Sequence, residues 1–97
     1  MRMRKKPNLI PRMERCEACL IRDAETHRGR WRELKPDAAQ LRLELGCGKG
    51  RFTAETAQQH PDVLFVAVER VPDAMVIAME RVMKLGLTNV FFVDGDA

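Results

Sequence analysis

The chain has 97 residues, of which 45% are hydrophobic and 32% are charged, which is ordinary for one small globular domain. No apolar run in the sequence approaches the roughly 20 residues that a membrane helix needs. The basic start, "MRMRKKPNLIPRMERC", lacks the apolar core of a secretory signal. We therefore expect a cytoplasmic protein that does not enter a membrane.

Charge is distributed unevenly along the chain. Residues 1–32 contain ten Lys/Arg and four Asp/Glu, whereas residues 33–97 contain seven and ten. A basic arm on a mildly acidic body suggests contact with a polyanion such as nucleic acid, although a solvated arm without such a partner fits the charge equally well. We expect residues 1–36 to form this arm and residues 37–97 to form a folded domain.

The first third of the chain predicts little regular structure. Residues 1–12 are basic and contain two prolines, so we expect them to be extended or mobile. Residues 13–25 fit a short helix. Residues 27–36, "HRGRWRELKP", predict a loop, because a glycine and a proline interrupt any longer element. We expect Trp31 to anchor this loop to the body of the protein rather than to stack on a base.

Cys16 and Cys19 form a C-x-x-C pair. A structural zinc site needs four ligands, and His27 is the only nearby candidate for a third, so we expect no metal site. A redox role is no better supported, because the pair does not open a helix after a strand. The favoured interpretation is two reduced cysteines one turn apart on a helix.

From residue 41 the pattern becomes regular and alternates between strand and helix signals. The apolar patterns predict strands and helices in the order strand 41–45, helix 49–60, strand 63–68, helix 73–85 and strand 90–93. Short connections and right-handed crossovers make this a parallel β-α-β-α-β unit. The sequence therefore predicts an α/β, Rossmann-like three-layer fold, of which this chain carries the first half.

Polar clusters follow each predicted strand. Glu44 and a glycine loop end the first strand, Glu69 ends the second, and Asp94 and Asp96 end the third. Ligands of doubly wound sheets bind at the carboxyl ends of the strands. We therefore expect these groups, about 25 residues apart in sequence, to converge at one edge of the sheet.

The glycine loop, "LGCGKG", matches neither common phosphate-binding pattern. A P-loop requires a glycine where Leu43 stands and Ser or Thr where Gly50 stands, so Lys49 is expected to face solvent. The dinucleotide fingerprint G-x-G-x-x-G requires its third glycine where Arg51 stands. The loop is instead G-x-G-x-G, with glycines at 46, 48 and 50.

Charge favours S-adenosylmethionine over a dinucleotide as the ligand of this loop. A pyrophosphate needs bare backbone N–H groups without a nearby carboxylate, and Glu44 lies two residues before Gly46. A carboxylate there suits the ammonium and sulfonium groups of S-adenosylmethionine. Glu69 is placed to accept from both ribose hydroxyls, and Asp96 from the adenine amino group.

The residues resemble bacterial tRNA (guanine-N7)-methyltransferases, which are class I S-adenosylmethionine-dependent methyltransferases. The resemblance lies in "MRMRKKP", "RGRWRELKP", "LELGCGKGRF", "AVER", "LGLTNV" and "DGDA". It implies methyl transfer from S-adenosylmethionine to N7 of guanine 46 of tRNA. It implies cofactor contacts for Glu44, Glu69 and Asp96, to which the spacing adds Gly46, Gly48 and Gly50 as a backbone cradle.

The resemblance also implies what these residues lack. The family continues past the counterpart of Ala97, where the next strand end carries an aspartate held to be catalytic and later segments bind tRNA. We therefore expect an N-terminal part of a longer enzyme, inactive alone and without a catalytic residue of its own. The first predicted strand, central in a complete sheet, would then lie at an edge.

Three alternatives stay open at this stage. The chain would otherwise be a class I methyltransferase with another substrate, a non-catalytic cofactor- or RNA-binding module, or an NAD-binding fragment, which Glu44 disfavours. The sequence leaves open whether the protein is a monomer or a homodimer.

Overall fold

The computed structural model describes residues 9–46 and 48–95. Its centre is a four-stranded parallel sheet in the order β1-β4-β3-β2. The strands are β1 (Leu20–Ile21), β2 (Gln40–Leu45), β3 (Val63–Glu69) and β4 (Val90–Asp94). The helices are α1 (Leu9–Arg15), α2 (Arg51–Gln59) and α3 (Pro72–Lys84), and the short 3-10 helices are η1 (Glu17–Cys19), η2 (Ala24–His27) and η3 (Trp31–Leu34).

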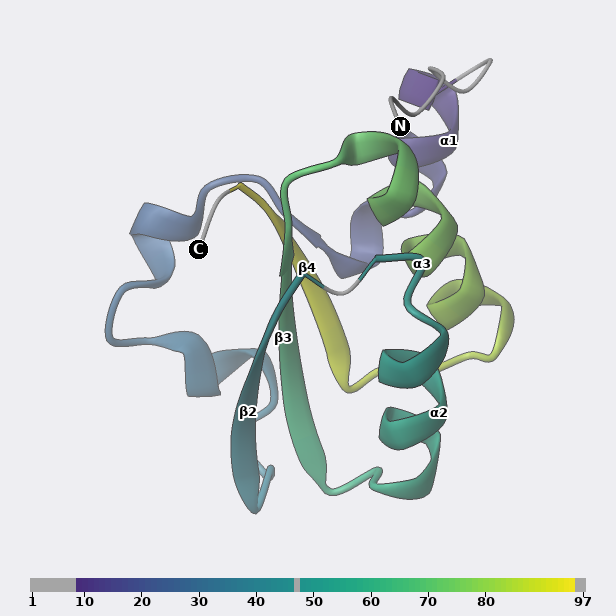
Figure 1. Ribbon diagram of the computed structural model, residues 1–97. Coiled ribbons are helices and arrows are strands. Elements are labelled where there is room, and N and C mark those ends of the chain that lie inside the picture. The colour runs from purple at the N-terminus through teal and green to yellow at the C-terminus, as the bar shows by residue number, and fades with distance from the viewer. Residues whose placement is uncertain (1–8, 47, 96–97) are drawn as a thin grey trace.

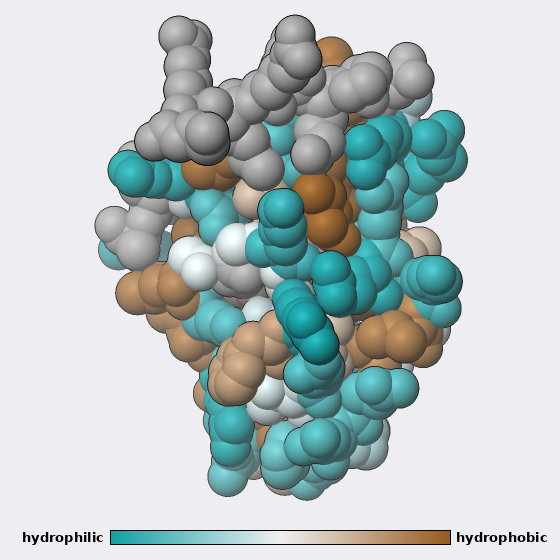
Figure 2. Space-filling model, turned by 45° about the vertical axis from the view of Figure 1, so that its right-hand side comes forward, coloured by the Kyte–Doolittle hydropathy of each residue, from teal (hydrophilic) through white to brown (hydrophobic). Residues whose placement is uncertain are grey.

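The sheet lies between two layers (Figure 1). α1, α2 and α3 lie on one side of it, and the segment that carries η2 and η3 lies on the other. The main core fills the helical side, where β3 contributes Val63, Phe65 and Ala67 by strict alternation. Figure 2 shows the outer surface of the helical side, which is mostly hydrophilic with separate apolar patches, as expected of amphipathic helices.

The predicted α/β architecture is confirmed. Each of the five elements predicted from residue 41 onward is present, with ends shifted by at most two residues. β1 was not predicted, because a two-residue strand has no periodicity to detect; it pairs with β4 through Leu20↔Phe92 and Ile21↔Val93. Among residues 9–46 and 48–95, each helix is too short or too polar to cross a lipid bilayer.

The N-terminal prediction is wrong in two respects. Residues 9–12 are helical rather than extended, because Pro11 occupies the first turn of α1, where a proline is tolerated. The helix predicted over residues 13–25 ends at Arg15 and is replaced by η1, β1 and η2. Burial explains the break, since Leu20 pairs with β4 and packs into the core. Residues 1–8 lie outside the described residues.

An ion pair attaches the basic N-terminal helix to the body. Arg12 Nε and Nη2 donate to Glu80 Oε2 and Oε1 at 2.9 and 2.5 Å, across 68 residues of sequence. This two-point geometry fixes the orientation of both planar groups. The hydrogen bond from Arg12 lowers the pKa of the Glu80 carboxyl. α1 is therefore held on α3 by charge as well as by apolar contact.

Gly50 allows the glycine loop to lie directly against α3. Its φ is +74°, and a Cβ there would overlap Ala78 Cβ and lie 2.8 Å from Ala78 Cα. No side chain fits at such separations without moving the backbone of α3. Gly50 is thus required by packing and by its left-handed backbone.

Asn89 connects the end of α2 with the starts of β3 and β4. It is buried at the residue before β4. Its Nδ2, which carries two hydrogens, lies 3.0–3.1 Å from three backbone oxygens, those of Ala57, His60 and Val63, so that one hydrogen is shared between two of them. Two of these carbonyls also accept within the turn, Ala57 O from the His60 N–H and His60 O from the Val63 N–H. The Asn89 amide therefore ties a turn that is already hydrogen-bonded to the start of β4.

β2 lies at the edge of the sheet in the described part of the chain, as expected. Leu43 is 65% exposed and Leu45 57% exposed, both on the face away from the helices. Trp31 lies over part of this face and lines an apolar cavity of about 370 Å³ with Leu41, Leu43, Val66, Val68 and Val93. Trp31 therefore anchors the η2–η3 segment to the sheet, as predicted.

The Arg12–Glu80 pair predicts a pH-dependent contribution to stability. Because the folded-state pKa of Glu80 is lowered, its contribution is present above the usual carboxyl range and is lost as the pH falls through the folded-state pKa. Glu80→Gln should reduce the free energy of unfolding at pH 7 by no more than about 1 kcal/mol, since the pair is partly exposed. Urea titrations at several pH values measure this, with Glu55→Gln as the control. A difference between wild type and Glu80→Gln that is independent of pH would contradict it.

Gly50→Ala should destabilise the protein more than Gly86→Ala. Both glycines have left-handed φ, +74° and +68°, but a Cβ at Gly86 would meet nothing within 4 Å. The left-handed backbone costs about 1–2 kcal/mol in either variant, and overpacking adds about 1–3 kcal/mol only at Gly50. Denaturant unfolding of both variants measures the difference. Equal losses of stability would show that α3 tolerates the added methyl group.

Candidate functional site

The glycine loop and the ends of β3 and β4 lie at the same edge of the sheet. The Gly46 N–H donates to the Val68 oxygen at 2.8 Å, and the Gly95 N–H donates to the Glu69 oxygen at 3.1 Å. Both bonds extend the strand ladders by one residue beyond the strands. Glu69 is in register with Asp94 on the neighbouring strand. The expected convergence is confirmed for these groups, while Asp96 lies outside the described residues.

The Glu69 carboxylate binds the glycine loop to the start of α3. It is 7% exposed. Its Oε1 accepts from the Gly48 N–H at 2.8 Å, and its Oε2 accepts from the N–H groups of Arg70 and Val71 at 3.0 and 3.2 Å. A buried carboxylate requires such partners, and backbone donors to a charged acceptor are strong ones. One side chain therefore fixes the glycine loop relative to the end of β3 and to the turn that opens α3.

Glu44 lies on the same face of the sheet as Glu69. It is half-buried in β2 and is in register with Ala67, two residues before Glu69 on β3. Side chains two apart on a strand share a face, so both carboxylates face the helical side. Asp94, which follows buried Phe92 by two residues, shares this face by the same alternation. The edge thus gathers three carboxylates, of which Asp94 was noted in the sequence but not assigned a role.

The three loop glycines serve different purposes. Gly46, Gly48 and Gly50 all have left-handed φ, at +69°, +56° and +74°, which only glycine adopts readily. A Cβ on Gly46 or Gly48 would meet nothing within 4 Å, whereas one on Gly50 would strike Ala78. Gly46 and Gly48 therefore leave open space beside the backbone, whereas Gly50 lets the loop pack against Ala78 of α3. Lys49 is exposed, as predicted.

The hydrogen bonds of the loop oppose a phosphate ligand. A helix-terminal phosphate site needs backbone N–H groups that point at the ligand. Here the N–H groups of Gly46 and Gly48 donate within the protein, to Val68 and Glu69. The carboxylates at the edge are acceptors, which suit cationic groups and hydroxyls. The chemistry of the site therefore matches a positively charged ligand that carries hydroxyl donors.

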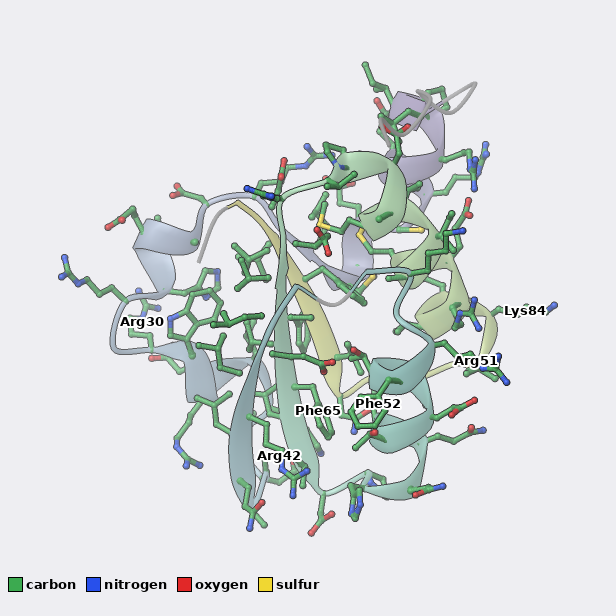
Figure 3. The ribbon with its side chains drawn as sticks, in the orientation of Figure 1. Arg30, Arg42, Arg51, Phe52, Phe65 and Lys84 are labelled. Carbon is green, nitrogen blue, oxygen red and sulfur yellow. The ribbon has the colours of Figure 1, made fainter. Side chains whose placement is uncertain are left out.

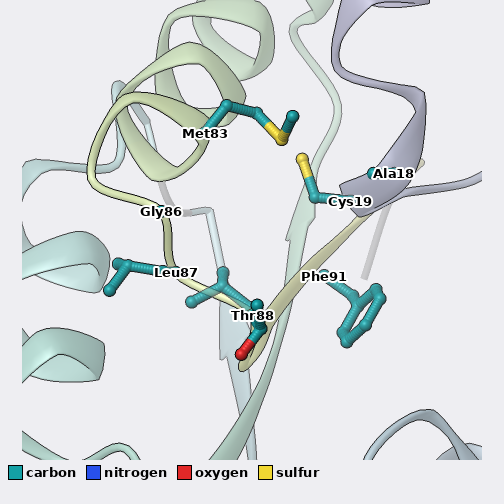
Figure 4. Close-up of a pocket in the computed structure, with 8 residues that line it drawn as sticks. Ala18, Cys19, Met83, Gly86, Leu87, Thr88 and Phe91 are labelled. Carbon is teal, nitrogen blue, oxygen red and sulfur yellow. The ribbon is translucent and has the colours of Figure 1, made fainter.

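The two cysteines at the N-terminal side are structural. Cys16 and Cys19 are free thiols in the core, and Cys19 Sγ donates to the Cys16 oxygen at 3.3 Å. Burial raises the pKa of Cys19 to about 12 and raises that of Cys16 as well, so both thiols stay protonated near neutral pH. Cys19 borders an apolar cavity of about 290 Å³ with Met83, Leu87 and Phe91 (Figure 4). In residues 9–46 and 48–95 no three His, Cys, Asp or Glu side chains form a metal-binding group.

Replacing Glu69 by Gln should release part of the loop. Gln has one acceptor oxygen where the carboxylate has two, so either the Gly48 amide or the Arg70 and Val71 amides would face an NH2 group. A hydrogen bond to a charged group contributes about 1.5–3 kcal/mol, so the affected amides should exchange hydrogen roughly 10–100 times faster where exchange follows local opening. Glu44→Gln is the matched control. Unchanged exchange at all three amides would contradict the bracing role of Glu69.

Comparison with known proteins agrees with this geometry. Residues 38–97 match the family described as "Putative methyltransferase". A tRNA (guanine-N(7)-)-methyltransferase of Geobacillus kaustophilus is 40% identical over all 97 residues, and the chain spans 45% of the length of that relative. The relative named likewise in Acetivibrio thermocellus is 44% identical over 69 residues, which are 71% of this chain and 31% of the relative. The resemblance found in the sequence is confirmed.

Solved structures of methyltransferases share the fold of this chain. An antibiotic-related methyltransferase aligns with 66% of this chain and 34% of its own, with a TM-score of 0.60 and 20% identity, which shows a shared fold. A protein-L-isoaspartate O-methyltransferase aligns with 68% of this chain and 22% of its own, with a TM-score of 0.51 and 31% identity. The matched family covers well over half of the residues, including all of β2 to β4 and the glycine loop. The chain is therefore a member of this methyltransferase family.

Proposed function

We propose that the chain binds S-adenosylmethionine at the carboxyl edge of the sheet and serves methyl transfer to N7 of guanine 46 in tRNA. The single observation that carries the proposal is the buried Glu69 carboxylate, which braces the glycine loop and leaves the edge rich in acceptors. The names of the relatives supply the reaction and the substrate.

Each site residue has a role that fits its surroundings. Glu69 keeps one of its four lone-pair sites beyond the three that the N–H groups use, and this site accepts from a ribose hydroxyl. Glu44 attracts the ammonium group, and the open space beside Gly46 and Gly48 admits the ligand to the backbone. Asp96 accepts from the adenine amino group. Gly50 supports the loop from below through its contact with α3.

The reaction requires the protein to align the methyl donor with the acceptor nitrogen, and it requires little general acid–base catalysis. The cofactor, when bound, supplies a methyl group already activated by the sulfonium. Guanine N7 carries a free lone pair, so no proton has to be removed before attack, and the task of the site is to hold donor and acceptor in line. An exposed carboxylate at the edge, such as that of Asp94, stabilises the positive charge that develops on the purine.

We assign cofactor binding, rather than complete methyl transfer, to these 97 residues. The chain accounts for 45% of the length of the Geobacillus kaustophilus relative. In addition, Leu43 and Leu45 on β2 are exposed, which is unusual for a strand that carries a ligand loop in a parallel sheet. Both observations support a need for further polypeptide to complete the catalytic site.

Calorimetric titration with S-adenosylhomocysteine tests the proposal. We expect binding by the wild-type chain, at least tenfold weaker binding by Glu69→Gln, and no effect of Glu55→Gln, which alters an exposed carboxylate on α2. NAD should bind more weakly than S-adenosylhomocysteine, because the Gly46 and Gly48 N–H groups already donate within the protein. Binding of NAD in preference to S-adenosylhomocysteine would refute the ligand assignment, and turnover of unmodified tRNA by the chain alone would refute the division of roles.

A further inference from the structure

Residues 28–32, "RGRWR", place three arginines at alternate positions on the side of the sheet away from α2 and α3. We propose that Arg28 and Arg32 bind phosphates of the RNA substrate, an inference that rests on the proposed function. We refer to residues 28–32 as the arginine stretch. Figure 3 shows Arg30 of this stretch on the opposite side of the molecule from Arg51 and Lys84, which project from α2 and α3.

The three arginines differ in whether their charge is used within the protein. Arg30 donates through Nε and Nη2 to both carboxylate oxygens of Glu33, each at 3.1 Å. Arg28 and Arg32 are exposed, and in the part of the chain that the structure describes their guanidinium groups have no hydrogen-bonded or ion-paired partner. Two unpaired guanidinium groups therefore flank one that is already neutralised, and an exposed pair of this kind is available to an external anion.

Trp31 holds the stretch in place. Its ring lines the 370 Å³ apolar cavity against β2, β3 and β4, and it stacks on His27 with ring centroids 5.1 Å apart. It also lines a second, open hollow of about 330 Å³ together with Ala24, Glu25 and Arg28. Because Trp31 is fixed on one side by the sheet, the backbone that carries Arg28 and Arg32 is preorganised, which reduces the entropic cost of binding.

The stretch is reached directly from the edge that carries the cofactor site. β1 is parallel to β4, so the chain leaves β1 at the same carboxyl edge at which Glu69 and the glycine loop lie. Arg22 and Asp94 line a small cavity of about 150 Å³ there. Residues 22–35 then cross the face of the sheet toward β2, with the arginine stretch midway. The arginine stretch is therefore connected to the edge with the glycine loop by only a few residues of chain.

Phosphate is the ligand that this arrangement fits. Guanidinium groups bind phosphate oxygens through paired N–H donors, and alternate arginines on a short exposed segment suit a sugar–phosphate backbone. The excess of positive charge lies before residue 33, since residues 33–97 contain ten Asp/Glu against seven Lys/Arg. Binding should therefore be electrostatic and sensitive to salt.

The test is the salt dependence of binding to an unmodified tRNA transcript. Filter binding between 50 and 200 mM salt gives the slope of log affinity against log salt, whose magnitude falls by about one for each phosphate that the protein no longer neutralises. Arg28→Gln and Arg32→Gln should each lower this magnitude by about one and weaken binding several-fold. Arg30→Gln should have a smaller effect, because Glu33 already neutralises that charge. Arg51→Gln, an exposed arginine on α2 paired with Glu55, is the matched control and should match wild type.

Two readouts separate this inference from the proposed function and from misfolding. S-adenosylhomocysteine affinity and the midpoint of unfolding should be unchanged in Arg28→Gln and Arg32→Gln, since neither side chain contributes to the core. If tRNA binding and its salt slope are the same in these variants as in Arg51→Gln, the inference is overturned while cofactor binding stands. If the wild-type chain does not bind tRNA at all, the inference is likewise overturned.

Discussion

The structure of the ligand edge depends on the buried carboxylate of Glu69. A charge removed from water is tolerated only when donors replace the missing solvent, and here all three replacement donors are backbone N–H groups. One comes from the glycine loop and two from the turn that opens α3. The end of β3, the loop after β2 and the start of α3 are thus fixed relative to one another by one side chain.

The same interaction decides which ligands the edge accepts. A loop whose N–H groups remain free attracts phosphates, but this loop donates inward, from Gly48 to Glu69 and from Gly46 to the end of β3. What remains on the outer side are carboxylate lone pairs and open space beside two glycines. The backbone of the loop resembles a nucleotide-binding turn, but the groups around it are negatively charged carboxylates, whereas a phosphate site offers positive charge. Loop shape and ligand charge are therefore separate properties in folds of this class.

Sequence patterns predicted those elements whose apolar residues repeat with the spacing of a strand or a helix. "VLFVAV" reads as a buried strand and the methionine-rich 73–85 segment as an amphipathic helix, and both lie where expected. The segment before residue 40 was predicted poorly, because its structure is set by contacts with distant residues. α1 depends on Glu80 for its ion pair, and β1 exists because Phe92 pairs with Leu20.

The residues of the candidate site could be predicted from the sequence, but the hydrogen bonds and packing contacts between them could not. Strand ends and glycine spacing identified Glu44, Glu69 and the loop, since parallel topology brings strand ends together. No pattern in the sequence indicates that the Glu69 carboxylate would accept from Gly48, or that Gly50 would lie against Ala78 rather than beside a ligand. Both facts depend on how closely α3 approaches the loop, which is a property of packing.

The amide of Asn89 has a consequence for how the chain folds. Its three acceptors lie 26 to 32 residues earlier in the sequence. The turn between α2 and β3 is closed by its own backbone N–H groups, and it gains the Asn89 donor only when the residue before β4 is in place. Ordering a loop of that length has an entropic cost that only the final contacts offset. Asn89 therefore couples the stability of the turn in the first β-α-β unit to the docking of β4.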